Sequence, residues 1–98
     1  MKDKIFSRIK VENMSGSREG KPVANQFIIT VDNDRYFQSY DSIIALKRFG
    51  KYPQIVLDEH YWNYSTTTSK YRNKFLGEDT KETEKKIKSG EYVLANLN

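Results

Sequence analysis

The clearest structural signal in the chain is the stretch NQFIITVDNDRYFQSY at residues 25–40. In its first half, Phe27, Ile29 and Val31 occupy alternate positions, which is the period of two that a β-strand shows. The turn formers at residues 32–34 follow, and Asn and Asp accept the left-handed backbone that a tight hairpin needs. We therefore predict two antiparallel strands joined by this turn.

Two further regions predict strands that extend the hairpin into a sheet. Before it, Ile5, Ile9 and Val11 alternate with charged residues, which indicates a strand with these apolar side chains on one buried face. After it, residues 42–49 favour a strand over a short capped helix, because their isoleucines are β-branched. Residues 54–57 are then the partner strand of a second hairpin.

The pattern changes to helical in the last third of the chain. Ser65 is a good N-cap for a helix over Thr66–Leu76, and Asp79 begins a capping box for a second helix over Thr80–Ser89. Each helix would end at a glycine, and the second would be mostly solvated because it has one large apolar side chain. The tail over Tyr92–Leu97 would either add an edge strand or pack loosely.

Together these elements predict a single α+β domain over residues 1–98. Its core would be a small, mostly antiparallel sheet of four to five strands, followed by two short helices. The polar stretch at residues 15–22 predicts a connecting loop. A chain of 98 residues buries only about two-thirds of its unfolded surface, so the core must be thin and leaves little room for a deep substrate cavity.

Composition limits where the protein works and what it can bind. The chain has no cysteine, which excludes disulfides, thiolate nucleophiles and thiolate metal ligands. No apolar run approaches the roughly 20 residues needed to cross a bilayer, and the amino terminus carries no secretory signal. We expect a cytoplasmic protein that does not enter the membrane. The net charge of +4 attracts polyanions mildly, but many proteins that bind none share it.

The chain offers few residues for catalysis. His60 is the only histidine, and beside Asp58 and Glu59 it resembles part of a metal site or a general base. Metal sites recruit further His or Cys ligands, and a histidine base needs a positioned nucleophile, so a structural or surface histidine is favoured. We expect no enzyme activity, no metal and no cofactor.

The first predicted helix begins with a phosphate-friendly pattern. Hydroxyl side chains at residues 65–69 precede the cations Lys70, Arg72 and Lys74, and helix amides attract anions. Capping and packing by the hydroxyls explain the same residues, and no glycine-rich approach loop supports a nucleotide site. Both interpretations stay open, with capping favoured. If this surface binds a partner, we expect Lys70, Arg72 and Lys74 to be its binding residues.

The tip of the second predicted hairpin mixes cations with aromatic rings. Arg48, Phe49, Lys51 and Tyr52 are the four residues that we expect to contact a partner. Cations suit a nucleic-acid backbone and rings suit unstacked bases, whereas Arg and Tyr are also enriched at protein hot spots. An ordinary solvated loop is the remaining interpretation.

The aromatic cluster before the first helix is the last feature of this kind. Tyr61, Trp62 and Tyr64 would form either an exposed platform or a plug that seals the sheet to the helix. In so short a chain a single tryptophan is favoured in the core, so the plug is preferred.

Five short motifs between residues 25 and 77 carry a family resemblance: NQF at 25–27, YFQSY at 36–40, IIA at 43–45, WNYSTTTSKY at 62–71 and FL at 75–76. Together they resemble a family of small bacteriophage proteins known only as a domain of unknown function. The resemblance implies an accessory phage protein that is made in the cytoplasm of an infected bacterium. It implies no active site.

Two functional hypotheses follow. The first is a phage accessory protein that binds a host protein, as an inhibitor of a defence or replication protein, by analogy with other small phage proteins. The alternative is a nucleic-acid-binding accessory protein that uses the basic and aromatic hairpin tip. A DNA-mimic inhibitor is disfavoured, because such proteins need dense carboxylates and this chain is net positive.

Overall fold

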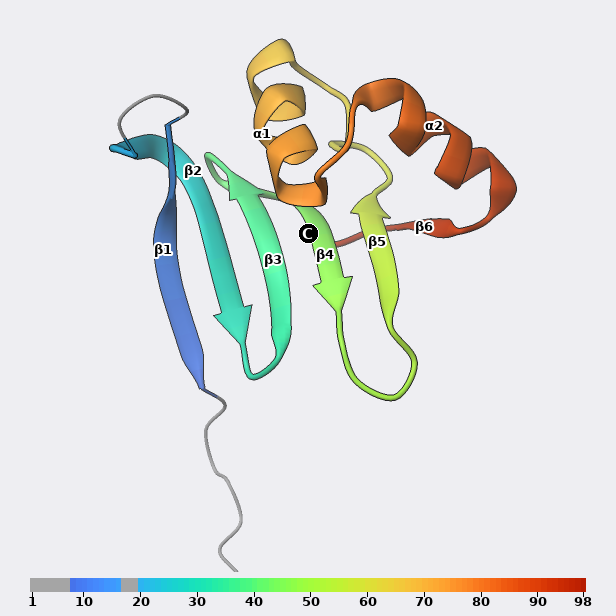
Figure 1. Ribbon diagram of the computed structural model, residues 1–98, viewed down its shortest axis with the longest axis horizontal. Coiled ribbons are helices and arrows are strands. Elements are labelled where there is room, and N and C mark those ends of the chain that lie inside the picture. The colour runs from blue at the N-terminus through green and yellow to red at the C-terminus, as the bar shows by residue number, and fades with distance from the viewer. Residues whose placement is uncertain (1–7, 17–19) are drawn as a thin grey trace, which may run out of the picture.

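The computed structural model describes residues 8–16 and 20–98, and the structural statements that follow concern these residues. One sheet carries two helices against one part of it (Figure 1). The elements are β1 Ile9–Ser15, β2 Pro22–Val31, β3 Asp34–Ser39, β4 Ser42–Arg48, β5 Gln54–Asp58, α1 Thr66–Leu76, α2 Thr80–Ser89 and β6 Tyr92–Ala95.

The sheet has six strands in the order β1-β2-β3-β4-β5-β6. The first five run antiparallel to their neighbours, and β6 pairs with β5 in parallel. The α+β class is therefore confirmed, but the sheet is larger than the four to five strands expected. A parallel strand arises because α1 and α2 form the connection between β5 and β6 and return the chain to the end where β5 began.

The hairpins predicted from the sequence are present. The turn that joins β2 and β3 consists of residues 32–33, with Asp32 in the left-handed region at a φ of 55°. Asp34, predicted as part of the turn, is the first residue of β3. The ambiguous segment after it is a strand, as favoured. The first strand is displaced from its predicted position at Ile5–Val11, and residues 5–7 of that prediction lie outside the described residues.

The predicted loop at residues 15–22 is shorter than expected. Ser15 and Pro22 are register partners that close the β1–β2 pairing, and the Gly16 N–H donates to the Lys21 carbonyl at 2.7 Å. Residues 17–19 of the predicted loop lie outside the described residues.

Both helices begin and end where the sequence predicts. The Ser65 hydroxyl accepts the Thr68 N–H at 3.1 Å at the start of α1, and Asp79 accepts the Glu82 N–H at 2.9 Å at the start of α2. Left-handed glycines follow the two helices, with φ of 75° at Gly77 and 85° at Gly90. Neither helix is long and apolar enough to span a membrane.

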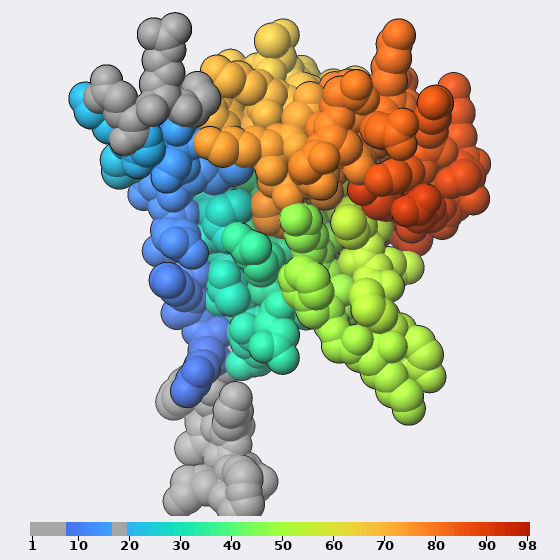
Figure 2. Space-filling model, in the orientation of Figure 1, coloured from blue at the N-terminus to red at the C-terminus, as the bar shows by residue number. Residues whose placement is uncertain are grey.

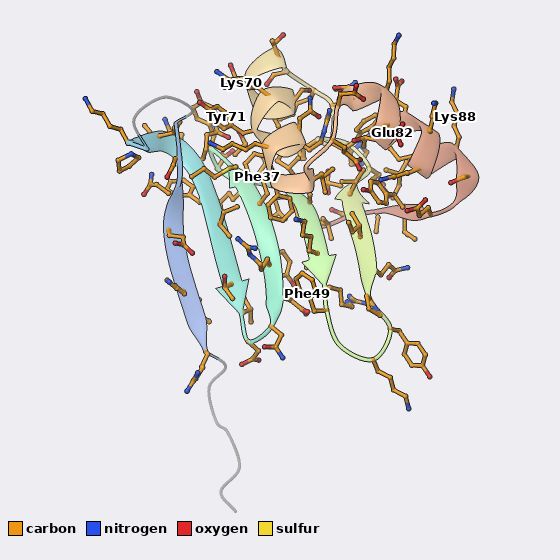
Figure 3. The ribbon with its side chains drawn as sticks, viewed as in Figure 1. Phe37, Phe49, Lys70, Tyr71, Glu82 and Lys88 are labelled. Atoms are coloured by element: carbon orange, nitrogen blue, oxygen red, sulfur yellow. The ribbon has the colours of Figure 1, made fainter. Side chains whose placement is uncertain are left out.

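The core lies between the helices and one face of the sheet. Phe37 of β3, which Figure 3 labels, stacks on Phe75 of α1 with ring centroids 5.8 Å apart. Ile87 of α2 packs against the same cluster. Burying side chains of this size supplies about 1.5–3 kcal/mol each. The buried members are Met14, Ile28, Phe37, Ile44, Ala45, Leu57, Phe75 and Tyr92.

The opposite face of the sheet is also apolar, but no described helix packs on it. Phe27, Ile29 and Val31 share this face as predicted, and all three are only half-buried. Ile9 and Val11 are 66% and 60% exposed, so the expectation that they lie on a buried face is wrong. The helices cover the other face of the sheet instead, where Ile28 of β2 is buried.

Candidate macromolecule-binding surface

The tip of the β4–β5 hairpin projects from the end of the sheet that lies away from the helices (Figure 1). Its five residues, 49–53, follow the last register pair, Arg48 with Gln54. The Phe49 N–H donates to the Asp34 carboxylate at 3.0 Å, which fixes the base of the loop against β3. Gly50 has a φ of 120°, a conformation that side-chain-bearing residues rarely adopt.

All four predicted contact residues are exposed at this tip. Phe49 is 48% exposed and Tyr52 is 78% exposed, although large aromatic side chains are normally buried. The Lys51 ammonium lies 5.8 Å from the centroid of the Tyr52 ring, and Arg48 is exposed at the end of β4. The structure therefore brings these cations and rings together on one accessible surface.

Two shallow hollows meet at Phe49. One, of about 390 Å³, lies within the hairpin tip itself. The other, of about 400 Å³, is a groove that runs from the tip to the end of α1 and the start of β6. Figure 2 shows the hairpin as a projection below the helices, beside this region. The groove is lined by Lys47, Arg48, Phe49, Pro53, Gln54, Ile55, Leu76, Glu91 and Tyr92.

Lys47 gives the groove part of its positive charge. Its ammonium lies 4.7 Å from the centroid of the Phe75 ring and is half-buried. Burial lowers the pKa of Lys47, and repulsion from Arg35, its register partner on β3, lowers it further, while Glu78 opposes this change. The groove thus holds a partly desolvated cation, which interacts with a ligand more strongly than a solvated one.

Sequence reasoning missed most of the groove. Ile55, Leu76, Glu91 and Tyr92 come from β5, the end of α1 and the start of β6, which are far apart in the chain. No local pattern marks them as neighbours, because the β5-to-β6 crossover brings them together. Only the alternation of cations and rings at the tip was visible in the sequence.

The second predicted surface, at the start of α1, is partly present. Ser65 acts as the N-cap, and a hollow of about 390 Å³ lies beside it. Lys70 and Lys74 are exposed, and the Lys74 ammonium donates to the Ser15 carbonyl. Figure 3 shows Lys70 pointing away from the sheet. The hollow is lined by Asn63, Tyr64, Ser65, Thr66, Ser69 and Thr80.

Arg72 does not join that surface, so the expectation that it offers its charge to a partner is corrected. The side chain is 0% exposed, and its guanidinium carbon lies 5.1 Å from the centroid of the Trp62 ring. Burial lowers its pKa, whereas Glu78 and Glu84 act in the opposite direction. Its guanidinium donates to neutral acceptors of Trp62, Asn63, Ser69, Asn73 and Thr80.

The aromatic cluster before α1 is divided between interior and surface. Trp62 is half-buried and packs against the core, in the place expected for a plug. Tyr61 and Tyr64 are 36% and 47% exposed and meet edge to face with centroids 5.3 Å apart. The sequence did not show which of the three rings would be buried, because the irregular turn that leads into α1 sets the direction of each side chain.

Next to His60, the Asp58 side chain joins two segments of the chain by hydrogen bonds. His60 is exposed, with Nε2 3.3 Å from a Glu59 carboxylate oxygen. The buried Asp58 accepts N–H groups of His60, Tyr61 and Leu97. Burial raises the pKa of Asp58, but these bonds and one from the Asn98 side chain outweigh it and hold the pKa below its usual value. In the part of the chain that is described, no three His, Cys, Asp or Glu residues are grouped to hold a metal.

Comparisons with known proteins place the chain in a family and leave its partner open. No curated protein and no solved structure matches it significantly. One family model matches residues 9–91, which include β1 to β5 and both helices and end just before β6. The chain therefore belongs to the family of unknown function DUF8033.

Proposed function

We propose that this protein is a non-catalytic binding module that contacts a partner protein through the β4–β5 hairpin tip. The observation that carries the proposal is the position of Phe49, which is 48% exposed between two hollows of about 390 and 400 Å³. An exposed ring that is already held by neighbouring structure loses little entropy on binding. Tyr52 beside it adds a second large contact side chain.

The groove next to the tip supports a protein partner. Its lining combines the apolar side chains of Ile55, Leu76 and Tyr92 with cations at the tip. Protein hot spots have the same composition, with an aromatic or arginine anchor at the centre and polar groups at the rim. A partner's apolar side chain would enter the groove, and a carboxylate would meet Arg48 and Lys51.

The partner that we propose is a protein of a bacterial host cell, bound in its cytoplasm. The support for this step is the resemblance of residues 25–77 to small bacteriophage proteins, many of which act by stoichiometric binding to defence or replication proteins. Under this proposal the protein blocks its target by occupying a surface, without chemical change to it.

A single-stranded nucleic acid is the alternative partner, and one observation favours it. Lys47 and Arg48 line the groove together with Phe49, and Lys51 lines the tip hollow together with Tyr52. Among the residues that line the groove, Glu91 is the one carboxylate. Cations that follow a phosphate backbone beside rings that stack on bases are typical of single-strand binding.

The test of the proposal is a variant that combines Arg48→Ala, Phe49→Ala, Lys51→Ala and Tyr52→Ala. We expect it to fold and to lose capture of the bacterial protein that the wild type captures from lysate, with a loss of affinity for the purified partner of at least about 100-fold. Unchanged affinity of the folded variant would rule the tip out.

A matched control replaces four exposed residues of α2, combining Lys81→Ala, Glu84→Ala, Lys85→Ala and Lys88→Ala. It removes as many side chains, and we expect it to retain the partner. Circular dichroism and thermal melting of both variants separate a lost contact from a lost fold.

Salt dependence separates the two partner classes. Binding of a fluorescein-labelled oligothymidylate should fall by orders of magnitude between about 50 and about 200 mM salt if phosphate contacts dominate. A protein complex centred on Phe49 should weaken far less over that range. Tight, salt-sensitive binding of the oligothymidylate, lost in the tip variant, would replace the protein partner by a nucleic acid.

A further inference from the structure

The outer side of β1 is an open sheet edge. β1 is the first strand in the order of the sheet, and no described element lies beside it (Figure 1). The Arg8 carbonyl accepts the Asp32 N–H at 2.7 Å, so the main chain of Arg8 faces β2. Main-chain groups alternate in direction along an antiparallel pair. The N–H and C=O groups of Ile9, Val11 and Asn13 therefore point outward.

This edge lacks two of the features that usually protect an edge strand, a very short strand and a proline. It does carry two charged residues, Lys10 and Glu12, but they are of opposite sign. β1 is seven residues long, contains no proline, and pairs regularly with β2 from Ile9 to Asn13, with its one irregularity after Asn13. Its apolar residues Ile9 and Val11 are 66% and 60% exposed. A long, regular and apolar edge of this kind is a template for pairing with another strand.

We propose that the edge pairs with β1 of a second copy of this chain, antiparallel, about a two-fold axis at Val11. Val11 then faces Val11 of the second copy, and Ile9 faces Asn13 of the second copy on either side of the axis. All three are residues whose main-chain groups point outward, so the pairing forms about six inter-chain backbone hydrogen bonds. The result is a continuous sheet across both copies.

The charges on β1 specify this register. Lys10 and Glu12 lie on the same face of the strand, with the ammonium 4.0 Å from the carboxylate, and both are exposed. In the proposed pairing Lys10 faces Glu12 of the second copy, and the symmetry makes this contact twice. A two-fold axis at Ile9 would instead place Lys10 opposite Arg8, and like charges directly opposite are destabilising.

The pairing also joins the uncovered apolar faces of the two copies. Ile9 and Val11 lie on that face beside the half-buried Ile29 and Val31 of β2. Val11 gains Val11 of the second copy directly across the axis, and Ile9 gains the same residue as a diagonal neighbour. At the other edge of the sheet β6 has four residues, so open-ended growth through that edge is disfavoured and a closed dimer is expected.

The test reverses the charge of Lys10 or of Glu12, the two residues on either side of Val11. Sedimentation velocity from about 5 to about 500 µM should show a dimer with a Kd in the micromolar range, since one pair of strands buries a small interface. Lys10→Glu alone or Glu12→Lys alone should weaken the dimer by at least about tenfold, because each change places like charges opposite one another twice.

Rescue is the decisive arm of the experiment. An equimolar mixture of the Lys10→Glu and Glu12→Lys proteins should form a heterodimer with about the wild-type Kd, because every facing pair is then of opposite charge. The chain with both changes should dimerise with itself for the same reason. Simple loss of solubility or fold predicts neither result.

A backbone measurement locates the contact. Amide hydrogen exchange should be slowed at Ile9, Val11 and Asn13 at high protein concentration and not at low concentration. Val11→Pro removes an outward N–H that β2 does not use, so the monomer should fold while the dimer is lost. A protein that stays monomeric to about 500 µM, or a dimer indifferent to both charge reversals, would overturn the proposal.

Discussion

The two faces of the sheet are both apolar, yet only one became the core. On the helix-covered face Phe37 is 0% exposed and stacks on Phe75. On the other face Phe27, from the neighbouring strand, is only half-buried, and Val11 at the edge is 60% exposed. Leu46 and Val56 of the central strands lie on this second face too, and they are buried. Alternation therefore identifies which residues share a face, whereas burial depends on what covers each position: the helices cover the first face, and on the second face the central strands bury their side chains while the β1 edge does not.

The largest effect on stability is expected from truncating one phenylalanine on each face of the sheet. Phe37→Ala should destabilise the fold by about 3–5 kcal/mol, because it removes a fully buried ring and leaves a cavity under α1. Phe27→Ala should lose no more than about 1.5 kcal/mol, since part of that ring already contacts water. Urea unfolding at low protein concentration measures both. Equal losses would show that the two faces are equally buried in solution.

The next largest effect is expected at Arg72, the buried cation of α1. Arg72→Ala should destabilise the fold by about 2–4 kcal/mol, because the acceptors of Trp62, Asn63 and Thr80 lose the guanidinium that donates to them. Lys70→Ala is the control on the same helix, and it should change stability by less than about 0.5 kcal/mol because Lys70 is exposed. Similar effects at the two positions would contradict the buried placement of Arg72.

Acid should destabilise the fold through two carboxylates, Asp58 at the end of β5 and Glu78 between α1 and α2. Burial raises the pKa of Asp58 and of Glu78, but hydrogen bonds outweigh it and leave both pKa values below their ordinary 3.8 and 4.5. The unfolded chain therefore takes up protons at a higher pH than the folded chain. The stability from these groups is complete above about pH 5 and is lost as pH falls through about 4 and below.

The measurement is urea unfolding from pH 7 to pH 3. Asp58→Asn should lower stability at pH 7 and flatten its decline in acid, because the titrating group is gone. The exposed Glu91→Gln is the control and should leave the acid profile close to that of the wild type. If the Asp58→Asn protein loses stability in acid as steeply as the wild type, other carboxylates cause the loss.

The smallest effect on stability is expected at the hairpin tip. Phe49→Ala should change the free energy of unfolding by less than about 0.5 kcal/mol, since the ring is 48% exposed and lies outside the core cluster. Tyr52→Ala should behave in the same way, and thermal melting compares the two with the wild type. A loss above about 2 kcal/mol for either would make the tip part of the core rather than a contact surface.

The candidate site was half visible in the sequence. The alternation of cations and rings identified Arg48, Phe49, Lys51 and Tyr52, because a hairpin tip is local in the chain and exposed by geometry. The groove beside it was not predicted, since its other wall comes from α1 and β6. The placement of Arg72 was missed because its acceptors on the turn before α1 and at the start of α2 meet only in the folded chain.

The local structure of the chain follows from its sequence. The α1 cap at Ser65, the α2 cap at Asp79 and the turn at residues 32–33 depend on side chains that bond to, or permit, nearby backbone conformations, so they could be located from the residues alone. The tertiary structure alone decided which face of the sheet is covered and that β6 adds in parallel beside β5. These features depend on contacts between distant segments, whose free energy comes from packing that no short stretch of sequence contains.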